Sequence, residues 1–180
     1  MARKTGFKRY KGYNGKTTYF TVFIIHGKEE ELYRKIQQFV ETQLGFKTIV
    51  LKDEFNGKTI IEKLQQRIWE DTDCALAVMS ADDELKTLEV HARPNVLFEI
   101  GYCLGYFDQL YVEDYKNEIR PVILIKEDRT YTPSDLNGIE VIEYSKSHIG
   151  DERHLEKMYE AITQRITLLF AQIKNYYDED

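Results

Sequence analysis

The chain has 180 residues, 42% of them hydrophobic and 13% aromatic, which predicts one folded domain with its own core and excludes a disordered protein. No apolar run reaches the ~18 residues of a membrane span, and the basic N-terminus lacks the apolar segment of a signal peptide. We therefore expect a soluble, cytoplasmic protein without a membrane segment. The formal net charge of −6 argues against a general nucleic-acid binder, because such proteins turn a positive surface toward phosphates.

Residues 1–18 form a basic leader, with no acidic residue before Glu29. Tyrosines and glycines are interleaved with the cations, so the segment is either a nucleic-acid-binding arm or a solvated leader before the first strand. We favour the leader, because basic patches this short are common. A chain that begins near Thr17 is then expected to keep its fold. The basic residues are Arg3, Lys4, Lys8, Arg9, Lys11 and Lys16.

Five short segments are predicted as strands, most of them rich in β-branched or other apolar residues. Residues 74–79 are apolar without alternation, which is typical of a strand covered on both faces, so we place them at the centre of a parallel sheet. We expect the last segment to be an edge strand. The predicted strands cover 19–25, 46–51, 74–79, 120–125 and 139–144.

Helical periodicity separates these strands. Thr59 and Glu62 have the spacing of a capping box, and Pro94 opens an apolar helix after a polar, irregular stretch over 80–93. The alternation of strands and helices predicts an α/β fold with a doubly wound, mostly parallel five-stranded sheet and helices on both faces. The predicted helices cover 29–44, a segment from Thr59, 94–107 and a segment from 151.

The last predicted helix carries an apolar stripe that packs either on its own sheet or against another protomer as a coiled coil. We favour packing on the sheet for its first half, and both alternatives stay open beyond Leu169. The folded domain is therefore expected over 19–174, with an acidic tail over 175–180. The stripe consists of Leu155, Tyr159, Ile162, Ile166, Leu169 and Ile173.

Glu99 is the most informative residue for function, because it is an isolated acid on a predicted helix that is otherwise fit for burial. Burying an unpaired carboxylate is costly, so Glu99 requires a partner, a cleft or a raised pKa. The alternative is a partly exposed glutamate that the helix dipole stabilises. Asn95 lies one turn earlier and shares a face of the helix with Glu99.

Doubly wound sheets bind ligands at the carboxyl ends of their strands, and four further candidates lie there. Gly27 allows a ligand close to the backbone, and His26 can donate to a phosphate or a ribose. Asp82 follows the central strand and is either a ribose ligand or a loop acid. Arg93 precedes the third helix and is either a phosphate ligand or an ordinary surface arginine.

Other classes of site find no support in the sequence. The glycines form neither a dinucleotide-binding fingerprint nor a P-loop, and no serine or cysteine has the context of a nucleophile elbow. Cys74 and Cys103 lie in apolar segments, which predicts buried free thiols. No His, Cys and Asp set has the spacing of a metal site, so we expect neither a metal nor a bound cofactor.

Five blocks of the sequence together resemble bacterial predicted nucleotide-binding proteins with a TIR-like domain, relatives of the TIR effectors in cyclic-nucleotide-triggered anti-phage systems. The most specific block is Asn-Val-x-Phe-Glu-x-Gly, which contains Glu99. The blocks fall in order across about two thirds of the chain. They are VFIIHG (22–27), GKTIIEK (57–63), SADD (80–83), RPNVLFEIG (93–101) and PSDLNG (133–138).

The resemblance implies a flavodoxin-like TIR fold and cleavage of the nicotinamide N-glycosidic bond of NAD, which is a substrate here and not a cofactor. It assigns the catalytic role to Glu99. It also implies that the loop over 52–57 packs against a neighbouring protomer, and we count Phe55 of this loop among the substrate-binding residues. Activation by homo-oligomerisation is implied, driven by a cyclic-nucleotide-sensing domain or partner outside this chain.

Two other functions stay open. A nucleoside deoxyribosyltransferase shares the fold class, the N-glycosidic chemistry and a glutamate in a Phe-Glu-Ile-Gly-Tyr context. Such enzymes usually carry an Asp-x-Gly-Thr lead-in, however, which Arg-Pro-Asn replaces here at 93–95. The third function is that of a TIR module that only binds partners. The sequence does not decide between linear and cyclic ADP-ribose as the product.

Overall fold

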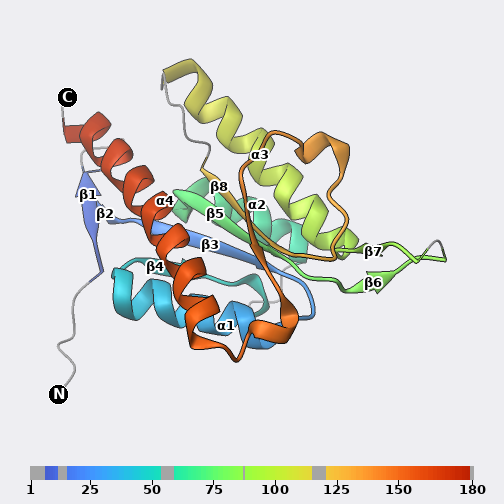
Figure 1. Cartoon of the computed structure of the whole chain (residues 1–180). Coiled ribbons are helices and arrows are strands. Elements are labelled where there is room, and N and C mark those ends of the chain that lie inside the picture. The colour runs from blue at the N-terminus through green and yellow to red at the C-terminus, as the bar shows by residue number, and fades with distance from the viewer. Residues whose placement is uncertain (1–6, 12–15, 54–58, 87, 115–120, 179–180) are drawn as a thin grey trace.

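The computed structural model describes the chain except for residues 1–6, 12–15, 54–58, 87, 115–120 and 179–180. Its centre is a fully parallel five-stranded sheet in the order β4-β3-β5-β8-β9 (Figure 1). The predicted strands and their parallel arrangement are confirmed, with the last strand at an edge. The strands are β3 (Thr21–His26), β4 (Lys47–Ile49), β5 (Cys74–Met79), β8 (Val122–Glu127) and β9 (Val141–Tyr144).

β5 lies at the centre of the sheet, as its unbroken apolar sequence predicts, and all six of its residues are buried. After β3 the chain first adds β4 on one side, then crosses to add β5 on the other side. The order of strands therefore reverses between β3 and β5. In parallel sheets the carboxyl ends of two such strands border a crevice in which ligands bind.

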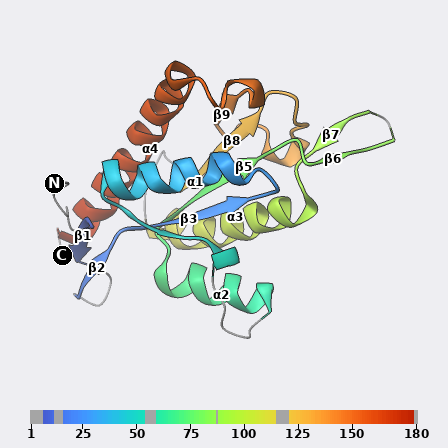
Figure 2. The same ribbon diagram turned by 90° about the horizontal axis from the view of Figure 1, so that it is seen from below.

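Helices cover both faces of the sheet (Figure 2). On one face lie α1 (Glu30–Phe39), which continues as the π-helix η1 (Val40–Leu44), and α4 (Glu152–Asp178). On the other face lie α2 (Ile60–Asp71) and α3 (Pro94–Asp114). The sheet thus separates two apolar cores. The loops between these elements include three short 3-10 helices: η2 (Leu51–Asp53), η3 (Ser134–Leu136) and η4 (Lys146–His148).

The predicted capping box at the start of α2 is present. The Glu62 amide donates to the Thr59 hydroxyl at 3.3 Å, and the Thr59 amide donates to the Glu62 carboxylate at 2.8 Å. The next helix, α3, is longer than the predicted 94–107, because no glycine or proline follows Phe107 to end it. Cys74 and Cys103 are buried free thiols, as predicted.

The C-terminal helix α4 packs on its own sheet along nearly its whole length. Its stripe is buried as far as Ile173, with Leu155 and Tyr159 half-buried at the start. The open question beyond Leu169 is thereby answered, since this end of α4 covers Phe20 and the N-terminal strand β1 (Arg9–Lys11). None of the described helices is both long enough and apolar enough to cross a membrane.

The described part of the predicted leader has exposed cations, as expected of a solvated segment, but it is folded. β1 (Arg9–Lys11) and β2 (Thr17–Tyr19) form an antiparallel hairpin. The Tyr10 hydroxyl donates to the carboxylate of buried Asp73, and the Lys8 ammonium lies 4.4 Å from the centre of the Phe46 ring. The tyrosine between basic residues is therefore a packing residue, which composition alone does not reveal.

This hairpin leads to a stability prediction. Replacing Tyr10 by Phe removes the hydroxyl that donates to Asp73 while keeping the ring against Phe20, so the free energy of unfolding is expected to fall by about 1–2 kcal/mol. The matched control is Tyr19→Phe, which removes an exposed hydroxyl and is expected to cost less than about 0.5 kcal/mol. Urea unfolding of both variants tests this, and equal stabilities would contradict the role given to Tyr10.

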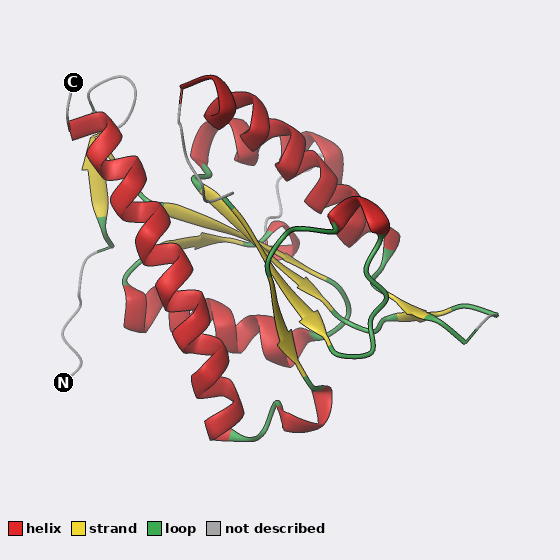
Figure 3. Ribbon diagram, turned by 45° about the horizontal axis from the view of Figure 1, so that its top comes forward, coloured by secondary structure: helices red, strands yellow, loops and turns green. Residues whose placement is uncertain are grey.

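The stretch over 80–93 is also more ordered than predicted. β6 (Asp83–Glu84) and β7 (Val90–His91) pair as an antiparallel hairpin that extends away from the body of the domain (Figure 3). We call this hairpin, residues 83–91 with the exception of residue 87, the arm. Strands of two residues are too short to show alternation, so the sequence gives no indication of them.

Candidate active site

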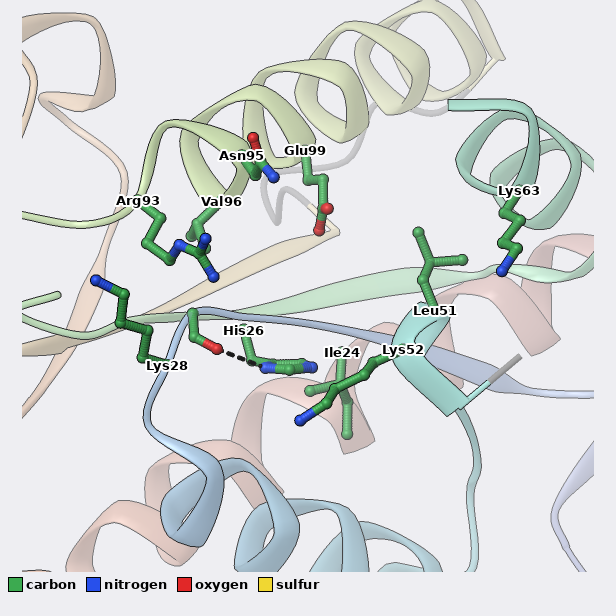
Figure 4. Close-up of a pocket in the computed structure, with 11 residues that line it drawn as sticks. Ile24, His26, Lys28, Leu51, Lys52, Lys63, Arg93, Asn95, Val96 and Glu99 are labelled. Carbon is green, nitrogen blue, oxygen red and sulfur yellow. Dashed lines mark hydrogen bonds between the residues drawn. The ribbon is translucent and has the colours of Figure 1, made fainter. Parts of the chain in front are cut away.

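A cleft of about 570 Å³ opens at the carboxyl ends of β3 and β4, against the first turns of α3 (Figure 4). It borders β3, one of the two strands between which the order of strands reverses. Polar and charged side chains reach it from four separate elements, and apolar side chains form part of its wall. The lining residues are Ile24, His26, Gly27, Lys28, Leu51, Lys52, Lys63, Arg93, Asn95, Val96 and Glu99.

Glu99 points from α3 into this cleft, between Arg93 on one side and Leu51 and Lys63 on the other (Figure 4). The side chain is half-buried, and burial raises its pKa from 4.5 to about 7. Removal of water from the carboxylate, which disfavours its charged form, is the cause of this shift. Close to neutral pH, Glu99 therefore exchanges readily between its charged and neutral forms.

Arg93 and Asn95 lie at the mouth of the cleft, at the start of α3. Both side chains are exposed, and Arg93 interacts electrostatically with Asp83 at the base of the arm. The start of α3 and the residue before it thus bring an arginine, an amide and a carboxylate to one cleft. The prediction that these three residues share one site agrees with their positions, and their roles stay predictions.

His26 and Gly27 line the opposite wall. The imidazole of His26 stacks on the Tyr33 ring, with centroids 3.7 Å apart and planes 19° from parallel. Its Nδ1 lies 2.9 Å from the Gly27 carbonyl oxygen, which can only accept, so Nδ1 carries a proton. Stacking and hydrogen bonding fix the ring at the edge of the cleft.

Asp82 does not line the cleft, so the predicted contact with a ribose finds no support. Its carboxylate lies behind Gly27 and accepts a hydrogen bond from the Lys28 amide at 3.0 Å. A methyl group on Gly27 would lie 1.8 Å from Asp82 Oδ2, so this close approach requires glycine. Asp82 therefore acts as a brace that holds the loop after β3.

This brace makes Gly27 intolerant of substitution. In Gly27→Ala the added methyl displaces the Asp82 carboxylate, and the free energy of unfolding is expected to fall by about 1–3 kcal/mol. Gly105→Ala is the matched control, because a Cβ there meets no atom within 4 Å and alanine favours the helix by about 1 kcal/mol. Thermal unfolding should therefore move in opposite directions for the two variants, and a Gly27→Ala protein as stable as the parent would contradict the brace.

Three lysines of the cleft were missed by the sequence analysis. Lys28 follows β3, Lys52 follows β4 in η2, and Lys63 lies in the first turn of α2. Lys28 pairs with Asp83 at 2.7 Å, and Lys52 pairs with Glu30 at 3.1 Å. Lys28 and Lys52 could have been predicted from their positions directly after β3 and β4, because ligands bind at the carboxyl ends of such strands.

Phe55 and the rest of the loop over 54–58 lie outside the described residues, so the predicted substrate contact and protomer contact stay predictions. Within the described part of the chain, no group of three or more His, Cys, Asp and Glu side chains could hold a metal ion. The chemistry open to the cleft is therefore that of one carboxylate, one imidazole, one amide and four cations.

Comparison with known proteins gives a family match. The family described as CAP12/Pycsar effector protein, TIR domain, matches residues 21–146, which include β3 to β9 and every residue that lines the cleft. The hairpin β1–β2 and the helix α4 lie outside the matched segment.

Two curated proteins and a solved TIR domain are among the proteins similar to the chain. Protein tirC of Dictyostelium discoideum is 31% identical over 74% of this chain and 68% of its own length. The uncharacterized protein YuaY of Escherichia coli K12 is 29% identical over 74% of this chain, which spans only 42% of YuaY. The TIR domain of the Toll-related receptor TRR-2 from Hydra magnipapillata superposes with a TM-score of 0.48 and 18% identity, over 81% of this chain and 98% of that domain.

Proposed function

This chain belongs to the family of CAP12/Pycsar effector TIR domains, and we propose that it is an NAD glycohydrolase that releases nicotinamide from NAD. The observation that carries the proposal is the position of Glu99, half-buried in a cleft whose other charged side chains are cations. A carboxylate in this setting suits a reaction that develops positive charge on a sugar. The surrounding cations suit a substrate that carries phosphates.

The proposed reaction breaks the bond between ribose C1′ and the nicotinamide nitrogen. The bonding electrons leave with the nicotinamide, which departs neutral, so the leaving group requires no acid. The ribose becomes an oxocarbenium ion, and the Glu99 carboxylate stabilises its charge directly or by brief covalent capture. Water then adds to C1′ and loses a proton, which gives ADP-ribose. Attack by the adenine of the same molecule gives cyclic ADP-ribose instead.

Substrate binding is assigned to the residues around Glu99. Arg93, Lys28 and Lys63 are cations from three elements and would bind the two negative charges of the pyrophosphate. Asn95 is one turn from Glu99 and would donate to a ribose hydroxyl. His26, held by its stacking on Tyr33, would border the nicotinamide side of the substrate.

The role proposed for Arg93 can be separated from that of Glu99. Arg93→Gln removes an exposed cation that contacts the pyrophosphate in both the ground state and the transition state, so KM for NAD should rise about tenfold with little change in kcat. Nicotinamide riboside lacks the pyrophosphate and serves as the matched control substrate. An equal loss for both substrates would contradict phosphate binding by Arg93.

We further propose that this activity serves anti-phage defence in the cytoplasm and is switched on by homo-oligomerisation. The family description as an effector supports this role. A cyclic-nucleotide-sensing domain or partner outside residues 1–180 would drive the assembly. Nucleic acid is not among the proposed ligands, since the chain carries a net charge of −6.

Two incubations distinguish the proposal from its alternatives. The purified chain is given NAD in one reaction, and a purine deoxynucleoside with a second free base in the other, over a wide range of protein concentration. Release of nicotinamide from NAD alone is the expected result. Exchange of the base would assign the chain to the deoxyribosyltransferases. A folded, self-associating protein without either activity would leave only the role of an interaction module.

A further inference from the structure

The arm carries apolar side chains into solvent. Leu85 and Leu88 are 46% and 78% exposed, and Tyr131 at the base of the arm is 45% exposed. Leu88 has a φ of 65°, in the left-handed region that is strained for a leucine. Residues that combine exposed apolar surface with backbone strain cluster at sites of contact. The arm therefore has the properties of a binding surface.

The described part of the arm contacts the domain near its base. The Tyr131 amide donates to the Val90 carbonyl at 2.8 Å, Val90 and Thr130 form a single bridge, and the His91 and Tyr131 rings lie 4.8 Å apart. A two-stranded ribbon is marginally stable in water without further cover. Beside the arm lies a groove of about 510 Å³, lined by Glu84, Leu88, Glu89, Val90, Arg129, Thr130 and Tyr131.

The charges of this groove are complementary to one another. Glu84 and Glu89 lie on the arm, whereas Arg129 lies on the facing loop after β8, with its side chain 69% exposed and bonded to buried Glu127 at 3.1 Å. A two-fold symmetric contact brings the same surface of two copies together. In such a contact Glu84 and Glu89 of each copy would face Arg129 of the other, and both apolar surfaces would be covered.

We infer that the arm is a self-association surface whose occupant is a second copy of this chain. Leu88 of each copy lies against Tyr131 of the other, and Glu84 of each lies opposite Arg129 of the other. An anionic lipid surface is the poorer occupant, because the groove carries two glutamates against one arginine that is itself paired with Glu127.

The arm also connects the contact to the cleft. Asp83 at its base pairs with Lys28, and Arg93 follows two residues after β7, so both ends of the arm lead directly to residues that line the cleft. Self-association on the arm holds these residues in place. This consequence for catalysis rests on the proposed NAD cleavage, whereas the contact itself does not.

Sedimentation velocity over a concentration series, without NAD, tests the contact. In Leu88→Asn the left-handed backbone is tolerated and the apolar contact is lost, so self-association should weaken tenfold to a hundredfold by a rough count of the buried area. Leu168→Asn is the matched control, because Leu168 is 45% exposed on α4, and its association should equal that of the parent. Thermal unfolding of both variants checks that the fold is kept.

Three outcomes would overturn the inference: a parent protein that stays monomeric at every concentration, equal weakening by both substitutions, or binding of the monomer to anionic lipid vesicles through Leu88. An inactive protein that self-associates through Leu88 would refute the proposed NAD cleavage and leave the contact intact. Loss of association with unchanged cleavage would instead remove the connection between the arm and the cleft.

Discussion

Glu99→Gln is expected to lower the rate of NAD cleavage by roughly two to four orders of magnitude. Glutamine keeps the size and hydrogen-bonding reach of the side chain but cannot carry the charge that faces the oxocarbenium ion. A carboxylate that stabilises the transition state by about 3–5 kcal/mol accounts for a loss of rate in this range. The Kd for NAD should change little, because the lost interaction belongs mainly to the transition state.

The control is Glu160→Gln, which makes the same chemical change on α4, away from the cleft, and should keep the parent rate. Turnover under saturating NAD and binding by calorimetry are the two readouts. A parallel loss of turnover and binding in Glu99→Gln would contradict a transition-state role and would make Glu99 a ground-state binding residue.

The pH dependence of cleavage is the second large effect expected. Because burial raises the pKa of Glu99 to about 7, the carboxylate form falls about tenfold for each pH unit below that value. kcat/KM should therefore rise about a hundredfold from pH 5 to a plateau above pH 8. In the complex with NAD, the positive nicotinamide ring stabilises the carboxylate, so the midpoint of kcat should lie at a lower pH than that of kcat/KM.

His26 is the other group of the cleft that belongs to a residue type that titrates near neutrality. The pH profile of His26→Gln should keep its midpoint near 7 if Glu99 is responsible. A midpoint that disappears in His26→Gln and persists on Glu99 replacement would assign the titration to the histidine.

Stability has the opposite pH dependence to activity. The folded state holds a proton on Glu99 up to a pH of about 7, whereas the unfolded chain releases it near 4.5, so this group makes stability fall as the pH rises between these values. The Glu99→Gln variant has no titrating group at this position, so its stability does not fall in this way. The stability of the variant relative to the parent should thus increase by about 2–3 kcal/mol from pH 5 to pH 8.

The sequence predicted the sheet because its strands are short apolar runs with few competing interpretations. The unbroken run of β5 indicated its central place, and the isolated charge of Glu99 indicated the cleft. The β1–β2 hairpin was not predictable in the same way, since Tyr10 finds Asp73 63 residues further along the chain. Contacts over such distances leave no local pattern.

The sequence also failed to predict several residues of the site, for a similar reason. Asp82 occupies the expected loop, but only the three-dimensional path shows that its carboxylate turns behind Gly27 and not into the cleft. Lys28, Lys52 and Lys63 look like ordinary surface lysines in sequence. They become informative when the fold brings them to one cleft from three elements, around a single carboxylate.

Nicotinamide release from NAD, measured side by side for the purified parent chain and Glu99→Gln at pH 8 and at concentrations that favour self-association, tests the central claim most directly. We expect the parent to form nicotinamide and ADP-ribose, linear or cyclic, in equal amounts, and a folded Glu99→Gln protein to form roughly a hundredth of this or less. Intact NAD after incubation with a folded, self-associated parent, or equal rates for the two proteins, would contradict it.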